Sequence, residues 1–162
     1  MSRKILIDLS VCRSCPECRV ECRYGYHPAN NGMKDLLELA LFQVTCRRCE
    51  DAPCLEACPA EALEKNEQGI IRRSLTLCIG CKSCVVACPF GTLMTHMFDF
   101  KKPICDYCGL DDDMPQLLCQ QTCPKGAVRL VEGEENPAGH IHKINNRLFV
   151  REYTWDQLKK NE

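Results

Sequence analysis

Sixteen cysteines in a chain of 162 residues constrain this sequence more than any other feature. They fall into four groups of four, called here quartets one to four, and no cysteine is left over. Quartets one and three have the spacing C-x2-C-x2-C-x3-C, quartet two has gaps of x2, x4 and x3, and quartet four has x2, x10 and x3. In chain order, the quartets are Cys12, Cys15, Cys18 and Cys22; Cys46, Cys49, Cys54 and Cys58; Cys78, Cys81, Cys84 and Cys88; and Cys105, Cys108, Cys119 and Cys123.

The ends of the quartets point to iron–sulfur chemistry. Proline follows the last cysteine of quartets two, three and four, at Pro59, Pro89 and Pro124, whereas Arg23 follows quartet one. A compact run that ends in Cys-Pro is the bacterial pattern for a [4Fe–4S] cluster, and its fourth cysteine ligates another cluster. Three closely spaced cysteines fit a tight loop around one cluster, and the fourth lies one helical turn further on. The spacing therefore predicts iron–sulfur sites.

Zinc and disulfides are the other uses of clustered cysteines. Zinc takes paired C-x2-C ligands, and the third cysteine of a compact quartet has no role there. The first residues, MSRKILIDLSVC, carry Asp8 and no long apolar run, unlike a secretory signal. We therefore expect a cytoplasmic protein, and disulfides are rare in that compartment. A zinc-stabilised interaction module stays as the alternative to an iron–sulfur protein.

Composition limits the remaining function classes. Aromatic residues make up only 6% of the chain, so we expect a thin core that bound metal reinforces. The net charge of -1 argues against a nucleic-acid partner, which would favour a basic excess. We expect no membrane span, because no apolar run approaches the required length. The chain also has no phosphate-binding glycine loop and no catalytic constellation outside its cysteines.

The four quartets, from Cys12 to Cys123, resemble the four-cluster ferredoxin-like electron-transfer subunits of oxidoreductase complexes. The resemblance implies an α+β fold that duplicates the bacterial dicluster ferredoxin, with short hairpins and helical turns around four [4Fe–4S] clusters. Quartets one and four would build one unit, from residues 1–45 and 99–162. Quartets two and three would build the other, from residues 46–98.

The resemblance also implies a crossed ligation, in which the last cysteine of each quartet binds the cluster of its partner quartet. Some relatives lack the second cysteine of quartet three and carry a three-iron cluster. Cys81 is present here, so four irons are expected at every site. The implied ligand sets are Cys12, Cys15, Cys18 and Cys123; Cys105, Cys108, Cys119 and Cys22; Cys46, Cys49, Cys54 and Cys88; and Cys78, Cys81, Cys84 and Cys58.

The function implied by the resemblance is electron transfer, with no catalysis by the chain alone. Its partner would be a catalytic oxidoreductase subunit of anaerobic metabolism, joined by a further redox subunit. The implied partner enzymes are a tungsten aldehyde oxidoreductase, a benzoyl-CoA reductase, a formate dehydrogenase or a hydrogenase. A free-standing polyferredoxin that shuttles between enzymes is the alternative within the same class.

Local patterns predict short elements between the quartets. A capping box at Thr154–Gln157 predicts a C-terminal helix. The other expected elements are strands at Ile5–Leu9, Phe42–Thr45 and Leu93–Phe98, a helix at Asp35–Ala40, a helical turn at Pro59–Leu63, a hairpin at Glu64–Arg73, and paired segments at Ala127–Glu132 and Lys143–Glu152 with a turn at Asn145 and Asn146.

Several polar residues invite a role beyond structure. We expect His140 and His142 to be strand positions rather than metal ligands, and His27 to be structural. Asp111–Asp113 predict a solvated loop, with a docking surface as the alternative. Three cations lie between cysteines, where they are either surface charges or groups that raise a cluster's potential: Arg47, Arg48 and Lys82.

Overall fold

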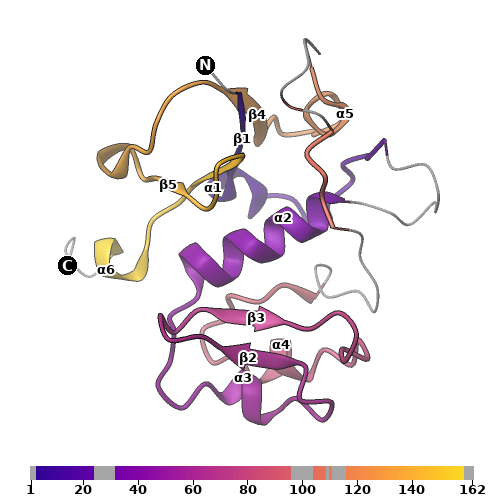
Figure 1. The fold of residues 1–162 in the computed structure, drawn as a ribbon, viewed down its shortest axis with the longest axis vertical. Helices are drawn as coiled ribbons and strands as arrows, with labels where there is room; N and C mark the ends of the chain where they lie inside the picture. Colours follow the sequence, from indigo (N-terminus) through magenta and orange to yellow (C-terminus); the bar gives the residue numbers. More distant parts are fainter. Residues whose placement is uncertain (1–2, 24–31, 96–103, 109, 111–115, 159–162) are drawn as a thin grey trace.

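Figure 1 shows the computed structural model, which describes residues 3–23, 32–95, 104–108, 110 and 116–158. Helix α2 (Gly32–Ala40) crosses the middle of the molecule. A four-stranded sheet and a two-stranded hairpin lie on its two sides (Figure 1). The mixture of helices and largely antiparallel strands confirms the predicted α+β class.

The larger sheet joins the two ends of the chain. Its strands are β1 (Lys4–Asp8), β4 (Val128–Val131), β5 (Ile141–Lys143) and β6 (Leu148–Arg151), in the order β4-β1-β6-β5. Strand β1 is antiparallel to β4 and parallel to β6, and β5 and β6 form a hairpin.

The predicted pairing of Ala127–Glu132 with Lys143–Glu152 is wrong, although both segments contain strands. Strand β1 lies between them and pairs with both. The reason is that Ile5 and Ile7 are almost fully buried, so the backbone groups of this strand need partners on each side. The turn that contains Asn145 and Asn146 joins β5 to β6, as predicted.

The smaller sheet is the hairpin that was predicted at Glu64–Arg73. Strands β2 (Leu63–Lys65) and β3 (Ile71–Arg73) pair in antiparallel register. The Asn66 side chain accepts hydrogen bonds from the backbone N–H groups of Gln68 and Ile70. The turn is therefore stabilised locally.

Helix α2 confirms the helix predicted at Asp35–Ala40, but the strand predicted at Phe42–Thr45 is wrong. The chain stays helical as the π-helical turn η1 (Leu41–Thr45), which ends where the Cys46 N–H donates to Leu41 O at 2.8 Å. Leu37, Leu41 and Val44 are buried at helical spacing, so one apolar stripe spans both segments.

Six short helical segments complete the described structure, and several of them contain cysteines. They are α1 (Leu9–Cys12), α3 (Pro53–Glu56), α4 (Ser83–Ala87), α5 (Leu118–Gln121), the 3-10 turn η3 (Pro137–Gly139) and α6 (Trp155–Leu158). One prediction here is wrong in position, and another can be compared with the structure only in its first half. Pro59 and Ala60 form only a turn after α3, and residues 93–95 form no strand, while residues 96–98 lie outside the described ranges.

Helix α6 confirms the predicted capping box in part, because the Gln157 side chain accepts from the Thr154 N–H at 3.0 Å. Within the described ranges, every helix is too short or too polar to cross a bilayer. The core packs α2 and η1 between the sheets, and partly buried cysteines extend it, including Cys12, Cys58 and Cys105. The cysteine loops are therefore part of the core rather than appendages.

Candidate metal centres

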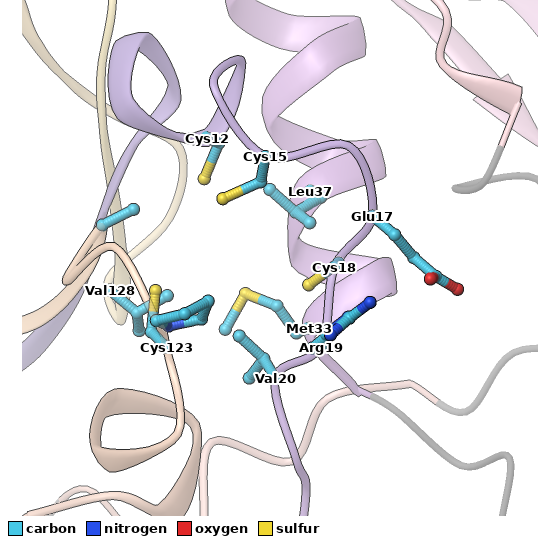
Figure 2. A pocket seen from close by; sticks show the side chains of 12 residues that line it. Cys12, Cys15, Glu17, Cys18, Arg19, Val20, Met33, Leu37, Cys123 and Val128 are labelled. Atoms are coloured by element: carbon cyan, nitrogen blue, oxygen red, sulfur yellow. The ribbon is translucent and has the colours of Figure 1, made fainter.

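Three cysteines of quartet one line one cavity together with the last cysteine of quartet four. Figure 2 shows the side chains of Cys12, Cys15, Cys18 and Cys123 around this shared space. Met33 and Leu37 of α2, together with Val20, Ala127 and Val128, supply an apolar wall. A thiol-lined cavity with apolar walls has the donor set that an iron–sulfur cluster requires.

Burial, together with repulsion from the neighbouring thiolates of Cys123, Cys18 and Cys15, raises the pKa of Cys12 to about 12. Thiolates crowded in this way need a cation among them. Metal binding to these thiols must therefore release protons.

Quartet two shares a second cavity with the last cysteine of quartet three. Cys46, Cys49, Cys54 and Cys88 line it, and Ile71, Phe90 and Leu93 contribute apolar walls. Burial raises the pKa of Cys54 to about 11, with repulsion from Cys46, Cys88 and Cys84. Cys84 belongs to a different group, described in the next paragraph, so the second centre lies close to that group.

The remaining eight cysteines form two further groups. Within each group, neighbouring thiolates raise one another's pKa. Burial raises the pKa of Cys105 to about 12, with repulsion from Cys108, Cys119 and Cys22. Burial likewise raises the pKa of Cys84, and the surrounding thiolates add to this effect. The thiolates around Cys84 are those of Cys58, Cys78 and Cys81.

Each of the four groups thus contains three cysteines of one quartet and the last cysteine of another. The ligand assignment itself stays a prediction. In the part of the chain that the structure describes, no three His, Cys, Asp or Glu side chains converge as they would on one metal ion. The thiols surround a volume, as they must when each binds its own iron at a corner of a cluster.

Left-handed backbone shapes the loop after the first cysteine of three quartets. The second residue after that cysteine has a positive φ, at Arg48, Gly80 and Tyr107. The backbone N–H groups of Arg48 and Tyr107 donate to the sulfurs of Cys46 and Cys105 at 3.5 and 3.4 Å. Non-glycine residues rarely adopt this conformation. The loop therefore bears a strain that aims the N–H group at a sulfur.

The Cys-Pro endings share a second device. The third residue after the cysteine has a positive φ, at Glu61, Gly91 and Gly126, and donates its N–H to the cysteine carbonyl at 3.1–3.2 Å. After the first of these turns, the Ala62 N–H donates to the Cys58 sulfur at 3.3 Å. Proline suits such a turn because its φ is already fixed.

Helix α2 holds the cysteine loops in place from the centre of the molecule. The Asp35 carboxylate accepts from the Cys105 N–H at 3.1 Å. A Cβ atom on Gly32 would lie 3.2 Å from the Cα of Cys105, so the loop needs glycine there to pack this closely. Met33 and Leu37 meanwhile line the first cavity.

Known proteins with similar sequences carry iron–sulfur clusters. The family profile described as a 4Fe-4S dicluster domain matches residues 37–133, and one described as a 4Fe-4S binding domain matches residues 9–25. The chain belongs to the 4Fe-4S dicluster domain family. The predicted resemblance is therefore confirmed at the level of the family.

Relatives of this dicluster-domain chain bear redox names. It is 32% identical over 149 residues to "Putative electron transport protein YsaA" of Escherichia coli K12, which covers 83% of this chain and 93% of the relative. It is 30% identical over 164 residues to "Electron transport protein HydN" of the same strain, with 82% and 89% covered. Identity to "Putative oxidoreductase AegA" is 33% over 150 residues, covering 81% of this chain and 22% of that protein. The chain is thus a member of an iron–sulfur electron transport family.

Arg73 lies at one of the cysteine centres, but the sequence alone did not indicate it. Its side chain is 1% exposed, pairs with Glu38 and donates from Nη1 to the Cys78 sulfur at 3.1 Å. Burial alone would lower the pKa of Arg73, but hydrogen bonds to Glu38 and Cys78 raise it above its usual value. In sequence Arg73 looks like its exposed neighbour Arg72, so only the fold distinguishes the two.

The predicted cations between cysteines lie at the surface or in turns. Arg47 is exposed and stacks on Phe90, with its guanidinium carbon 4.4 Å from the ring centroid. Arg48 donates to Gln43 O at 3.0 Å, and Lys82 adopts a positive φ just before α4. Their effect on a cluster potential stays a prediction.

The histidines of the β5 region have hydrogen-bond partners within the fold. His140 Nδ1 lies 3.4 Å from the Gln157 side-chain oxygen, and His142 Nε2 lies 2.9 Å from Glu152 O. His142 lies in β5, as predicted, but the strand position predicted for His140 is wrong, because His140 ends η3 with a positive φ. His27 and Asp111–Asp113 lie outside the described residues.

Proposed function

We propose that this chain is the electron-transfer subunit of an oxidoreductase complex and that it holds four [4Fe–4S] clusters. The observation that carries the proposal is the gathering of all sixteen cysteines into four groups of four thiols. A bound [4Fe–4S] cluster supplies reversible one-electron chemistry. The catalytic reaction would belong to a partner subunit, and the cytoplasm is the proposed compartment.

The residues of the chain would do three things for such clusters. The thiolates would ligate iron in the crossed sets named above, so that each compact loop also contributes a ligand to a neighbouring site. Backbone N–H groups, such as that of Tyr107 toward Cys105, would offset negative charge on the sulfurs. The apolar walls, including Met33 and Leu37, would limit access of water.

The relatives favour a partner enzyme over a zinc-stabilised module. A region like this chain makes up about a fifth of a protein named as an oxidoreductase, and most of proteins named for electron transport. The free-standing polyferredoxin remains the second candidate, since HydN and YsaA are single chains of similar length to this one. Gel filtration of the anaerobically purified protein distinguishes the two candidates. A monomer without co-purifying subunits would favour the polyferredoxin, and a larger complex would favour the subunit.

Iron counting in paired variants tests both the cluster number and the crossed ligation. The wild-type protein should contain about sixteen irons and sixteen acid-labile sulfides. Cys88→Ala combined with Cys49→Ala removes ligands of one proposed cluster, so about twelve irons should remain. Cys88→Ala combined with Cys84→Ala removes ligands of two clusters, so about eight should remain.

The two pairs are matched controls for each other, because each removes two thiols. Ligation within each quartet would reverse the two iron counts and refute the crossed scheme. Bound zinc without labile sulfide would refute the whole proposal.

A further inference from the structure

A buried arginine connects the central helix to one cysteine of quartet three. Arg73 lies at the end of β3, and its side chain is 1% exposed. Its Nε lies 3.1 and 3.2 Å from the two carboxylate oxygens of Glu38, and its Nη2 lies 2.6 Å from Oε2. The remaining nitrogen, Nη1, donates to the Cys78 sulfur at 3.1 Å.

We propose that Arg73 raises the reduction potential of the centre that contains Cys78, and that Glu38 positions it and limits the size of the rise. The inference rests on the proposed function, because it requires a cluster on Cys78. Arg73 does not ligate iron in this scheme. It acts on the ligand sulfur.

The electrostatic reasoning follows from burial. Reduction adds one negative charge to a cluster, and a donor aimed at a ligand sulfur stabilises that charge. A hydrogen bond from a charged donor is roughly twice as strong as one between neutral groups, and a buried site screens it weakly. Cys46, Cys58 and Cys105 instead receive hydrogen bonds from neutral backbone N–H groups.

Glu38 provides a test of the proposal, because loss of its charge should shift the reduction potential in the opposite direction to loss of Arg73. The carboxylate is also buried, with a side chain 6% exposed, and it faces the same guanidinium. Loss of Arg73 would leave a buried negative charge near the centre, which opposes reduction. Loss of the Glu38 charge would leave a buried positive charge, which favours reduction. A pair that serves only to join α2 to β3 would give no such opposite shifts.

The experiment is an anaerobic redox titration with dithionite, followed by electron paramagnetic resonance on the full-length protein. The variants are Arg73→Gln, Arg73→Lys and Glu38→Gln. Arg72→Gln is the matched control, because it removes the same charge from the exposed neighbouring position. The proposed ligand variant Cys58→Ser identifies which titration step belongs to this centre.

We expect Arg73→Gln to shift one step to a more negative potential, lowering its reduced-to-oxidised ratio at a fixed potential about tenfold. Glu38→Gln should shift the same step in the opposite direction. Arg73→Lys keeps a positive charge, so its step should shift less than that of Arg73→Gln. Arg72→Gln should leave the potential of every step unchanged.

The outcomes separate this inference from the proposed function. Unchanged steps in Arg73→Gln with full iron content, or shifts of equal sign in Arg73→Gln and Glu38→Gln, would overturn the tuning role alone. Loss of one cluster from both Arg73→Gln and Arg73→Lys would also overturn it, because it would show a structural role. Absence of labile sulfide from the wild-type protein would instead refute the proposed function.

Discussion

The C-terminal helix α6 is predicted to be held against the second centre mainly by Trp155, the only tryptophan in the chain. Its indole N–H donates to Thr45 O at 2.7 Å. Its ring meets the edge of Phe90 with centroids 5.5 Å apart, and the guanidinium carbon of Arg47 lies 5.5 Å from it. Phe90 lines the cavity that contains Cys88, so α6 covers this wall of the centre.

The size of the effect follows from these three contacts. A neutral hydrogen bond contributes about 1 kcal/mol, an aromatic pair about 1 kcal/mol, and an exposed cation–π contact about 0.5 kcal/mol. Trp155→Ala should therefore lower the free energy of local opening by about 2–3 kcal/mol, which speeds hydrogen exchange in α6 about a hundredfold. Trp155→Phe keeps a ring and loses the hydrogen bond, so it should speed exchange about fivefold.

Hydrogen exchange of the peptide that spans residues 148–158, measured by mass spectrometry, reports this opening. Asp156→Ala is the control, since it changes an exposed residue of the same helix. Iron loss in air should accelerate in the order Asp156→Ala, Trp155→Phe, Trp155→Ala. Equal exchange rates in Trp155→Ala and Asp156→Ala would show that other contacts hold the segment and that the reasoning is wrong.

Three further predictions concern the whole fold. Chelation of the iron should remove most native circular dichroism, because metal-binding energy is also folding energy; cooperative unfolding of the apoprotein would argue against this. Gly32→Ala should shorten the half-life of the visible cluster absorbance, since overpacking against Cys105 costs about 1–3 kcal/mol; an unchanged half-life would mean that the loop moves aside without cost. Leu36→Ala, at a site 1% exposed, should cost about 2–5 kcal/mol and lower the guanidinium midpoint of cluster loss, and a midpoint equal to that of the wild-type protein would contradict this.

The sequence predicted the iron–sulfur family better than the pairing of the larger sheet, because the information for the two differs in range. The spacing of a quartet fixes a loop within a dozen residues, and the Cys-Pro turns follow from the same local chemistry. The pairing of β1 with β4 joins residues such as Ile5 and Leu130, which are far apart in the chain. An apolar strand does not specify which distant partner it takes.

The failed strand at Phe42–Thr45 and the overlooked Arg73 have related causes. A short apolar run does not distinguish a strand from the last turn of a buried helix, and here tertiary packing extended α2 into η1. Arg72 and Arg73 are identical in type, and hairpin alternation alone places them on opposite faces. Only the position of α2 against that hairpin shows that Arg73 meets Glu38 and Cys78.

Helix α2 explains how a chain with few aromatic residues can fix the positions of several redox centres. Met33 contributes to the wall of the first centre, and Asp35 holds the loop of Cys105. Glu38 reaches Cys78 through Arg73. One helix thus contacts two of the four thiol groups and reaches a third through Arg73, so their relative positions depend on a single buried element rather than on a large core. Electron transfer between sites requires a constant distance between them, and a well-packed central helix maintains this distance with few residues.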